Sequence, residues 1–223
     1  MFQIELNPFV FECIRDEMLA FPEFEVKAQQ FGDVYRDRRG AMVVDVVASR
    51  QRNYLKVVVP KIVHEFEKTQ PPTLASLANN PPAYLKLRTG EVQTMVNVAI
   101  ELLAFGERSN LTNENEICYN WAMLASTYES EDADIDNLAI AEISGIGPAL
   151  LEYLRMRSGG NSLKVDVRVK NSLRAIGVPV DYLSDRGVYA VCQKISTELG
   201  ISMLELDQIL WRFTAEFRMP ECG

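Results

Sequence analysis

The sequence predicts an all-α protein, and three observations support this prediction. Apolar residues recur with the helical period along almost the whole chain. The one β-branched stretch, residues 43–47, has no evident partner strand, which favours a buried helix over a strand. Hydrophobic residues make up 48% of the 223 residues, which is enough for an ordinary core. A chain of this length can form one large helical domain or two small ones that share a cleft.

In the first half of the chain, prolines mark the helix boundaries. The apolar pattern of residues 55–66 predicts a helix, and Pro60 inside it predicts a kink or a helix restart. Residues 71–72 are both proline and stop this segment. Thr73 then caps a short helix that extends to Leu77.

In the second half, apolar faces and capping residues define the helices. Helices are expected at residues 92–106, ended by a glycine, and at about 114–126. The acidic residues 129–136 are most simply a solvated connector. Ser202 and Glu205 form a capping box, which places the start of the last helix there.

Charge and cysteine content narrow the classes of function. The net charge of −8 argues against a protein whose main task is to coat nucleic acid, although a local basic face can still contact phosphates. The cysteines form no CxxC pair, which argues against a bound zinc ion or iron–sulfur cluster and favours buried thiols; they are Cys13, Cys118, Cys192 and Cys222. No apolar run approaches the ~20 residues of a membrane helix, and the acidic N-terminus does not resemble a signal peptide. We therefore expect a cytoplasmic protein.

Residues 138–160 contain the motif on which the functional prediction rests. A short helix leads into Gly145-Ile146-Gly147, and a second helix begins near Pro148. The glycines allow a tight turn with positive φ and the close approach of another backbone, and proline suits the first turn of a helix. The unpaired N–H groups at that helix start form a ready site for a phosphate oxygen. The pattern predicts a helix-hairpin-helix; the alternative is a tight turn between helices that binds nothing.

An aspartate follows the hairpin at a specific distance. Asp166 lies 21 positions after Gly145, behind a loop that contains two glycines and at the start of another predicted helix. Such an aspartate is a normal N-cap, a role that can coexist with a functional one. The order of hairpin, helix, glycine loop and aspartate resembles the helix-hairpin-helix DNA glycosylase superfamily, the endonuclease III-like or HhH-GPD proteins. The similarity covers about residues 40–217, and its specific part is residues 143–177.

The resemblance implies a fold and an activity. It implies two helical lobes around a central cleft, with residues 40–158 forming one lobe that ends in the hairpin, and residues 1–39 and 159–223 forming the other. The activity would be hydrolysis of the N-glycosidic bond of a damaged or mismatched base in double-stranded DNA, as in base-excision repair. Asp166 would stabilise the positive charge that develops on the sugar and position the attacking water, after the base has been turned out of the duplex.

The resemblance also assigns binding residues. The DNA phosphate would be held at Ser144, Gly145, Ile146, Gly147 and Ala149, with a monovalent cation on the hairpin carbonyls as an option and no other cofactor or metal. The residues that would probe the duplex are Gln51, Arg52 and Asn53. A basic face would be formed by Arg155, Arg157, Lys164, Arg168 and Lys170; the alternative for these residues is an ordinary solvated surface.

Departures from the family pattern leave alternatives open. Ala149 stands where the members that cleave the backbone carry a nucleophilic lysine, so Schiff-base lyase activity is not expected. Arg168 stands where many members have histidine, and it would either contact a phosphate or pair with Asp166 and silence it. A catalytically inactive module that binds DNA or protein is therefore the second hypothesis. A purely structural helical protein with a coincidental turn is the third. His64, the only histidine, is interpreted as structural.

Overall fold

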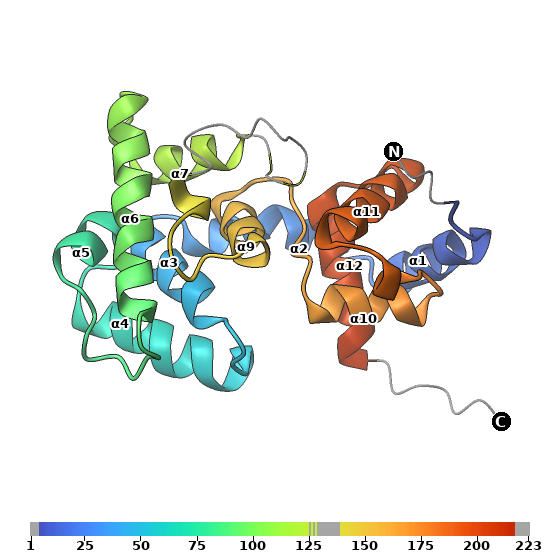
Figure 1. Ribbon diagram of the computed structural model, residues 1–223, viewed down its shortest axis with the longest axis horizontal. Coiled ribbons are helices and arrows are strands. Elements are labelled where there is room, and N and C mark those ends of the chain that lie inside the picture. Colours follow the sequence, from blue (N-terminus) through green and yellow to red (C-terminus); the bar gives the residue numbers. More distant parts are fainter. Residues whose placement is uncertain (1–4, 125, 127, 129–138, 217–223) are drawn as a thin grey trace. The chain divides into compact units, whose positions relative to one another are not determined.

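The protein is all-helical, as the sequence predicts. The computed structural model describes residues 5–124, 126, 128 and 139–216, with the side chains of 214–216 left out, and within these ranges it contains helices and no strand (Figure 1). None of the described helices is long and apolar enough to cross a membrane. Of the expected buried thiols, Cys118 and Cys192 are buried and Cys13 is half-buried. The predicted acidic connector at residues 129–136 and Cys222 lie outside the described residues.

The chain forms two compact units. One comprises Gly32–Gly160, and the other comprises Met1–Phe31 together with Asn161–Gly223. The sequence-based division placed the first boundary between residues 39 and 40 instead. Residues 32–39 belong with the hairpin unit, because η1 (Asp33–Tyr35) packs against α9 (Pro148–Ser158) and the buried Arg39 guanidinium donates to the carbonyl oxygens of Gly32 and Arg157.

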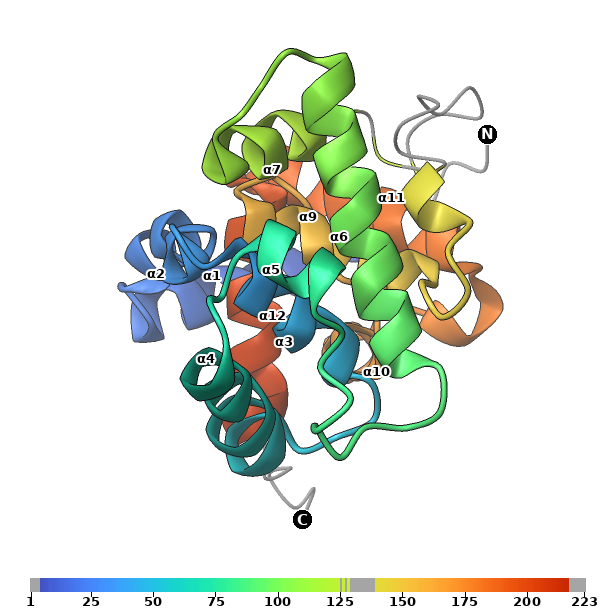
Figure 2. The ribbon, with the colours of Figure 1, turned by 90° about the vertical axis from the view of Figure 1, so that its left-hand side faces the viewer.

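Helix α3 (Arg39–Ala48) forms the centre of the Gly32–Gly160 unit. All ten of its residues are buried, which confirms that the β-branched stretch is a buried helix. Figure 2 shows α3 surrounded by other helices of this unit, which all pack against it: α4 (His64–Thr69), α5 (Leu74–Asn79), α6 (Glu91–Arg108), α7 (Glu114–Ala122) and α9. Because α3 is buried on all sides, its two ends are held in fixed positions. The residues that directly follow α3 belong to the candidate site.

The segment around Pro60 departs from a regular α-helix. Residues Tyr54–Val63 form a π-helix, η2, which continues directly into α4. In an α-helix the ring of Pro60 would clash with the carbonyl four residues earlier, and the wider π turn relieves this contact. The predicted disturbance at Pro60 is thus confirmed, although the helix widens and does not restart.

Of the other predicted boundaries, the cap at Thr73 is confirmed, whereas the helix ends at Gly106 and at about residue 126 are wrong, because α6 continues to Arg108 and α7 ends at Ala122. The Thr73 hydroxyl accepts from the Ser76 amide at the start of α5. By contrast, α6 continues past Gly106 to Arg108. The glycine is needed there for close packing, since a Cβ at this position would lie 2.5 Å from Cδ1 of Ile117 in α7.

The second unit is a small helical bundle around α12 (Met203–Glu216). This helix packs against α1 (Pro8–Ala20), α2 (Phe24–Phe31), α10 (Val167–Ala175) and α11 (Asp185–Leu199). Its predicted capping box is confirmed: the Ser202 amide donates to Oε2 of Glu205 at 2.6 Å, and the Glu205 amide donates to Oγ of Ser202 at 3.1 Å. This unit holds Asp166.

Candidate nucleic-acid interface

The predicted bend at Gly145–Gly147 is present. Residues 139–141 are helical, and α9 begins at Pro148. Gly145 has φ +94°, and a Cβ there would lie 2.7 Å from Oγ1 of Thr94. Gly147 has φ −99° and open space around it, so only one of the two glycines is required by backbone geometry. The chain therefore forms a tight turn between two helices, with its second glycine facing open space.

The hairpin presents bare amides to the surface. Ser144, Gly147 and Pro148 are exposed, Ala149 is half-buried, and Ile146 is buried and anchors the turn. Within the described part of the chain, the N–H groups of Gly147 and Ala149 have no hydrogen-bond partner. Together with the positive end of the α9 dipole, these donors form a geometry that suits an anionic oxygen.

Helix α6 holds the hairpin in place. The Thr94 hydroxyl, on the first turns of α6, donates to the Ser144 carbonyl at 2.7 Å. Thr94 is 4% exposed, so this bond is shielded from water. Sequence analysis missed Thr94, because one threonine on a helix gives no signal that a turn 50 residues later lies against it.

The residues predicted to probe the duplex, 51–53, belong to a turn that lies beside the hairpin and is called the probe turn below. Arg50 is exposed, and its Nη1 would be 3.0 Å from a Cβ at Gly145. Gln51 is exposed and has φ +52°, a conformation that is uncommon for a residue other than glycine and recurs at functional sites. Its side-chain oxygen accepts from Arg88 at 3.1 Å, and Asn53 caps η2 through the Lys56 amide. Three loops, residues 50–53, 86–91 and 143–147, are thus joined by direct contacts within one unit.

Arg52 is a structural residue of this turn and not a free probe. Its guanidinium donates to both carboxylate oxygens of Glu91, at 2.9 and 2.7 Å, and to the Ala48 carbonyl. Burial alone would raise the pKa of Glu91, but the hydrogen bonds from Arg52 and from the Arg88 amide outweigh it and hold that pKa below its ordinary value. The pair fixes the 86–91 loop to the end of α3.

The predicted basic face is wrong in two of its five residues. Arg155 and Arg157 are 5% and 6% exposed, and they pair with the buried acids Glu152 and Asp45. They point into the core because α9 is enclosed by other helices, with every residue from Leu150 to Ser158 buried. Neither guanidinium can reach a phosphate.

The other three predicted basic residues belong to the second unit, and each lies against an acidic or aromatic side chain. Lys170 pairs with Asp185 at 2.5 Å, and Nζ of Lys164 lies 3.6 Å from Oδ2 of Asp166. The Arg168 guanidinium lies over the Trp211 ring, 5.0 Å from its centre. Of these residues Arg168 is exposed, and the two lysines are half-buried.

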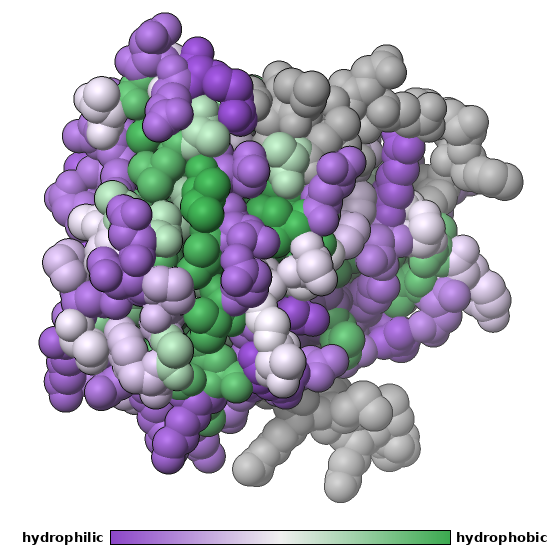
Figure 3. Space-filling view, turned by 60° about the vertical axis from the view of Figure 1, so that its left-hand side comes forward, coloured by the Kyte–Doolittle hydropathy of each residue, from purple (hydrophilic) through white to green (hydrophobic). Residues whose placement is uncertain are grey.

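A different set of cations lies on the segments that adjoin the hairpin, and Arg50 is the one whose guanidinium reaches Gly145. Four exposed side chains on the 50–56 and 86–88 segments make no ion pair within the described chain: Arg50, Lys56, Lys86 and Arg88. The Glu91 carboxylate beside them is neutralised by Arg52. The space-filling view shows a largely hydrophilic face of the molecule with a narrow apolar stripe (Figure 3). Arg50 thus brings a positive charge to the hairpin that carries the bare amides, despite the acidic total.

Asp166 is the N-cap of α10, as predicted. Its Oδ1 accepts from the amides of Arg168 and Val169 at 2.8 and 3.1 Å, and its side chain is 31% exposed. The Arg168 guanidinium lies over Trp211, and within the described residues it forms no ion pair with Asp166. One carboxylate oxygen is held by the helix and the other faces Lys164, which leaves an oriented, partly accessible acid.

Within the described residues, no group of three or more His, Cys, Asp or Glu side chains could hold a metal ion. Of the hairpin carbonyls, that of Ile143 accepts from the Ile146 amide and that of Ser144 from Thr94. Each carbonyl keeps a second lone pair, which among the described residues of this turn is the only feature that bears on the expected monovalent cation.

Comparison with known proteins identifies no relative. No protein-family model, curated protein or solved structure matches the chain. The similarity to a family therefore rests on residues 143–177 alone.

Proposed function

We propose that this protein is a monofunctional DNA glycosylase, which hydrolyses the N-glycosidic bond of a damaged or mismatched base. The observation that supports it best is the hairpin turn: Gly145 in a left-handed conformation, unpartnered amides at Gly147 and Ala149, and exposed cations from two other loops beside it. Amides at a helix start together with nearby arginine and lysine side chains are a usual way to bind a nucleic-acid phosphate.

The proposal accounts for the acidic net charge. Binding of the DNA backbone depends on the cations that contact phosphates and not on the protein's total charge. Arg50, Lys56, Lys86 and Arg88 are exposed and make no ion pair within the described chain. Glu91, which accepts from the Arg88 amide, is neutralised by Arg52, and the hairpin itself carries one exposed acid, Glu142. Gln51, held by Arg88, would then probe the base pairs beside the gripped phosphate.

Asp166 would perform the chemistry. The transition state of base removal resembles an oxocarbenium ion, and a carboxylate beside the sugar stabilises its positive charge and positions the attacking water. The two amide bonds to Oδ1 fix the carboxylate, while within the described residues Oδ2 accepts no hydrogen bond from the backbone. Ala149 offers no amine, so the product would be an intact abasic strand.

The second candidate is a module of the same fold that binds DNA without chemistry. Lys164 favours it, because its ammonium lies 3.6 Å from Oδ2 of Asp166 and would compete with a cationic sugar for that oxygen. The two candidates differ in one observable, release of a base.

The test is base release from DNA duplexes that carry uracil, an alkylated purine, an oxidised base or a mismatch. The wild-type chain is compared with Asp166→Asn, which keeps the N-cap because asparagine caps helices equally well. Asp185→Asn is the matched control, since Asp185 is also an exposed acid at a helix start with a lysine partner.

We expect at least one duplex to lose its base with the wild-type chain and the control, and Asp166→Asn to slow this by ~10²-fold or more. Borohydride should trap no covalent complex. Tight binding of every duplex without base release would establish the binding module instead. Equal rates for Asp166→Asn and wild type would show that Asp166 is not catalytic.

A further inference from the structure

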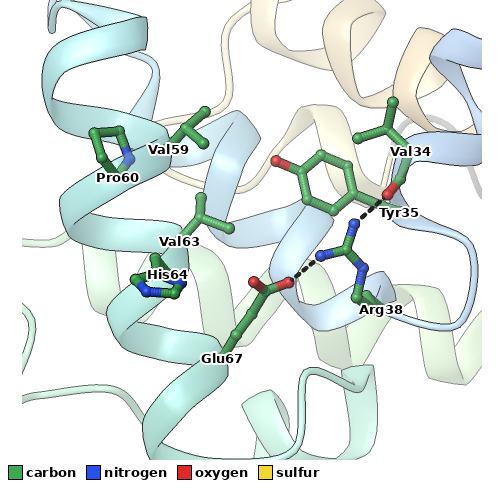
Figure 4. Close-up of a pocket in the computed structure, with 8 residues that line it drawn as sticks. All are labelled: Val34, Tyr35, Arg38, Val59, Pro60, Val63, His64 and Glu67. Atoms are coloured by element: carbon green, nitrogen blue, oxygen red, sulfur yellow. Dashed lines mark hydrogen bonds and ion pairs between the residues drawn. The ribbon is translucent and has the colours of Figure 1, made fainter.

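A pocket of about 290 Å³ lies in the Gly32–Gly160 unit, outside the loops assigned to DNA (Figure 4). Its walls come from η1, the residue before α3, and the continuous helix η2–α4. The lining residues are Val34, Tyr35, Arg38, Val59, Pro60, Val63, His64 and Glu67. The volume is near the lower end of the range for small-molecule sites, about 300 Å³, so the pocket suits a molecule of one or two rings.

The pocket has the shape of a slot. Val59, Pro60 and Val63 form one wall, and the Tyr35 ring faces them from the other side (Figure 4). Tyr35 is 3% exposed, and its ring lies 5.4 Å from the guanidinium carbons of both Arg38 and Arg157. The Tyr35 ring is therefore buried and held in place, and it forms a fixed floor of the slot. The side chains of Val34 and Val59, which are 46% and 38% exposed, supply the accessible apolar surface for a flat ring.

The opposite wall is the π-helical segment of the chain. A ten-residue π-helix, Tyr54–Val63, is unusual, and π turns occur frequently at functional sites. Here the turn places Val59, Pro60 and Val63 together along the slot. The irregular backbone therefore coincides with the pocket.

The polar end of the slot presents a donor beside an acceptor. Arg38 donates through Nη1 to Oε1 of Glu67 at 2.7 Å and through Nη2 to the Val34 carbonyl. A guanidinium has five N–H groups and a carboxylate two oxygens, so the pair keeps spare donors and a second oxygen. In Figure 4 the Glu67 carboxylate points into the space between His64 and Arg38. Because the two charges cancel, the pair favours an uncharged ligand.

We propose that this pocket binds a small, flat, uncharged ring that carries a hydrogen-bond acceptor next to a donor, as in a cyclic amide. The ring would lie between Val34 and Val59, over the floor formed by Tyr35, with its acceptor on Arg38 and its donor on Glu67. The site is separate from the hairpin and does not depend on the proposed glycosylase activity.

The test uses 2-pyridone, which has a carbonyl next to an N–H, and N-methyl-2-pyridone, which has the same ring without the donor. Each is titrated into the full chain, and binding is followed by NMR through the backbone signals of residues 34–38 and 59–67. We expect 2-pyridone to shift these signals with saturation and to bind about tenfold more tightly than the methylated ring.

Two variants separate the slot from the rest of the surface. Val59 is 38% exposed at the wall of the slot, so Val59→Trp should fill the slot and abolish the shifts. Ile100 on α6 is a β-branched residue of similar exposure, 46%, and Ile100→Trp should leave the shifts unchanged. No saturable shift at residues 34–38 and 59–67 in the wild-type chain would overturn the proposal. So would equal affinity for the two pyridones, or undiminished binding to a folded Val59→Trp.

Discussion

The buried pair of Asp45 and Arg157 should dominate the stability of the Gly32–Gly160 unit. Asp45 on α3 is fully buried, and its Oδ2 lies 3.3 Å from Nε of Arg157 on α9. The hydroxyls of Tyr54 and Tyr153 donate to the same oxygen at 3.1 and 3.2 Å. This cluster connects α3 and η2, the helices before and after residues 49–53, with α9, the helix that follows the hairpin.

The perturbation is Asp45→Asn. Asparagine keeps an acceptor for the tyrosines, so the substitution mainly removes the negative charge and leaves the guanidinium, whose side chain is 7% exposed, without a counter-charge. Removing one partner of a buried ion pair costs ~3–5 kcal/mol. With a urea m-value of ~2 kcal/mol per molar, the midpoint of unfolding should fall by ~2 M. Adding Arg157→Met removes the orphaned charge, so the double variant should recover ~2 kcal/mol or more.

The assay is urea unfolding of four proteins, the parent, both single variants and the double variant, in a Trp211→Phe background. This leaves Trp121, fully buried in the hairpin unit, as the fluorescent reporter of that unit. A loss below ~1 kcal/mol for Asp45→Asn, or additive effects of the two substitutions, would refute the argument that a buried charge is left uncompensated.

Two further predictions concern the loops of the proposed interface. Gly145→Ala should lower the unfolding free energy by ~1–2 kcal/mol, because φ at Gly145 is positive and a Cβ there would collide with Thr94. Gly147 lies in open space, so Gly147→Ala should change the unfolding free energy by less than ~0.5 kcal/mol but weaken DNA binding. Equal stability losses of the two variants in urea titrations would contradict this. Since the pKa of Glu91 is lowered on folding, its stabilisation is complete above the ordinary carboxyl pKa and is lost as the pH falls through the lower folded value. Stability measured from about pH 6 down to about pH 3 should therefore fall less in Glu91→Gln than in wild type, and parallel curves would show that Glu91 does not contribute.

Local signals in the sequence were sufficient for much of the fold. Caps at Thr73 and at Ser202 with Glu205 depend on residues within three positions of each other, and both are present as predicted. The hairpin turn and the Asp166 N-cap were predicted for the same reason, since each is determined by its own few residues.

The interface could be predicted only in part, because contacts distant in sequence determine it. Nothing around Arg157 indicates that its partner is Asp45, 112 positions earlier, so a buried ion pair was taken for part of a surface. Arg88 and Thr94 gave no signal of their own, since their meaning comes from Gln51 and Ser144 lying against them. A charge on a helix is thus assigned to surface or core only once its neighbours are known.

The most direct test of the proposed chemistry requires no knowledge of the substrate base. A duplex with a cationic pyrrolidine in place of one deoxyribose imitates the charged sugar of the transition state, and a duplex with tetrahydrofuran there is its neutral control. Affinities for the two duplexes are measured with the wild-type chain and with Asp166→Asn. We predict that the wild type prefers the pyrrolidine duplex by ~10²-fold and that Asp166→Asn loses this preference. Equal wild-type affinities for the two duplexes, or a preference that persists without the Asp166 carboxylate, would contradict the account.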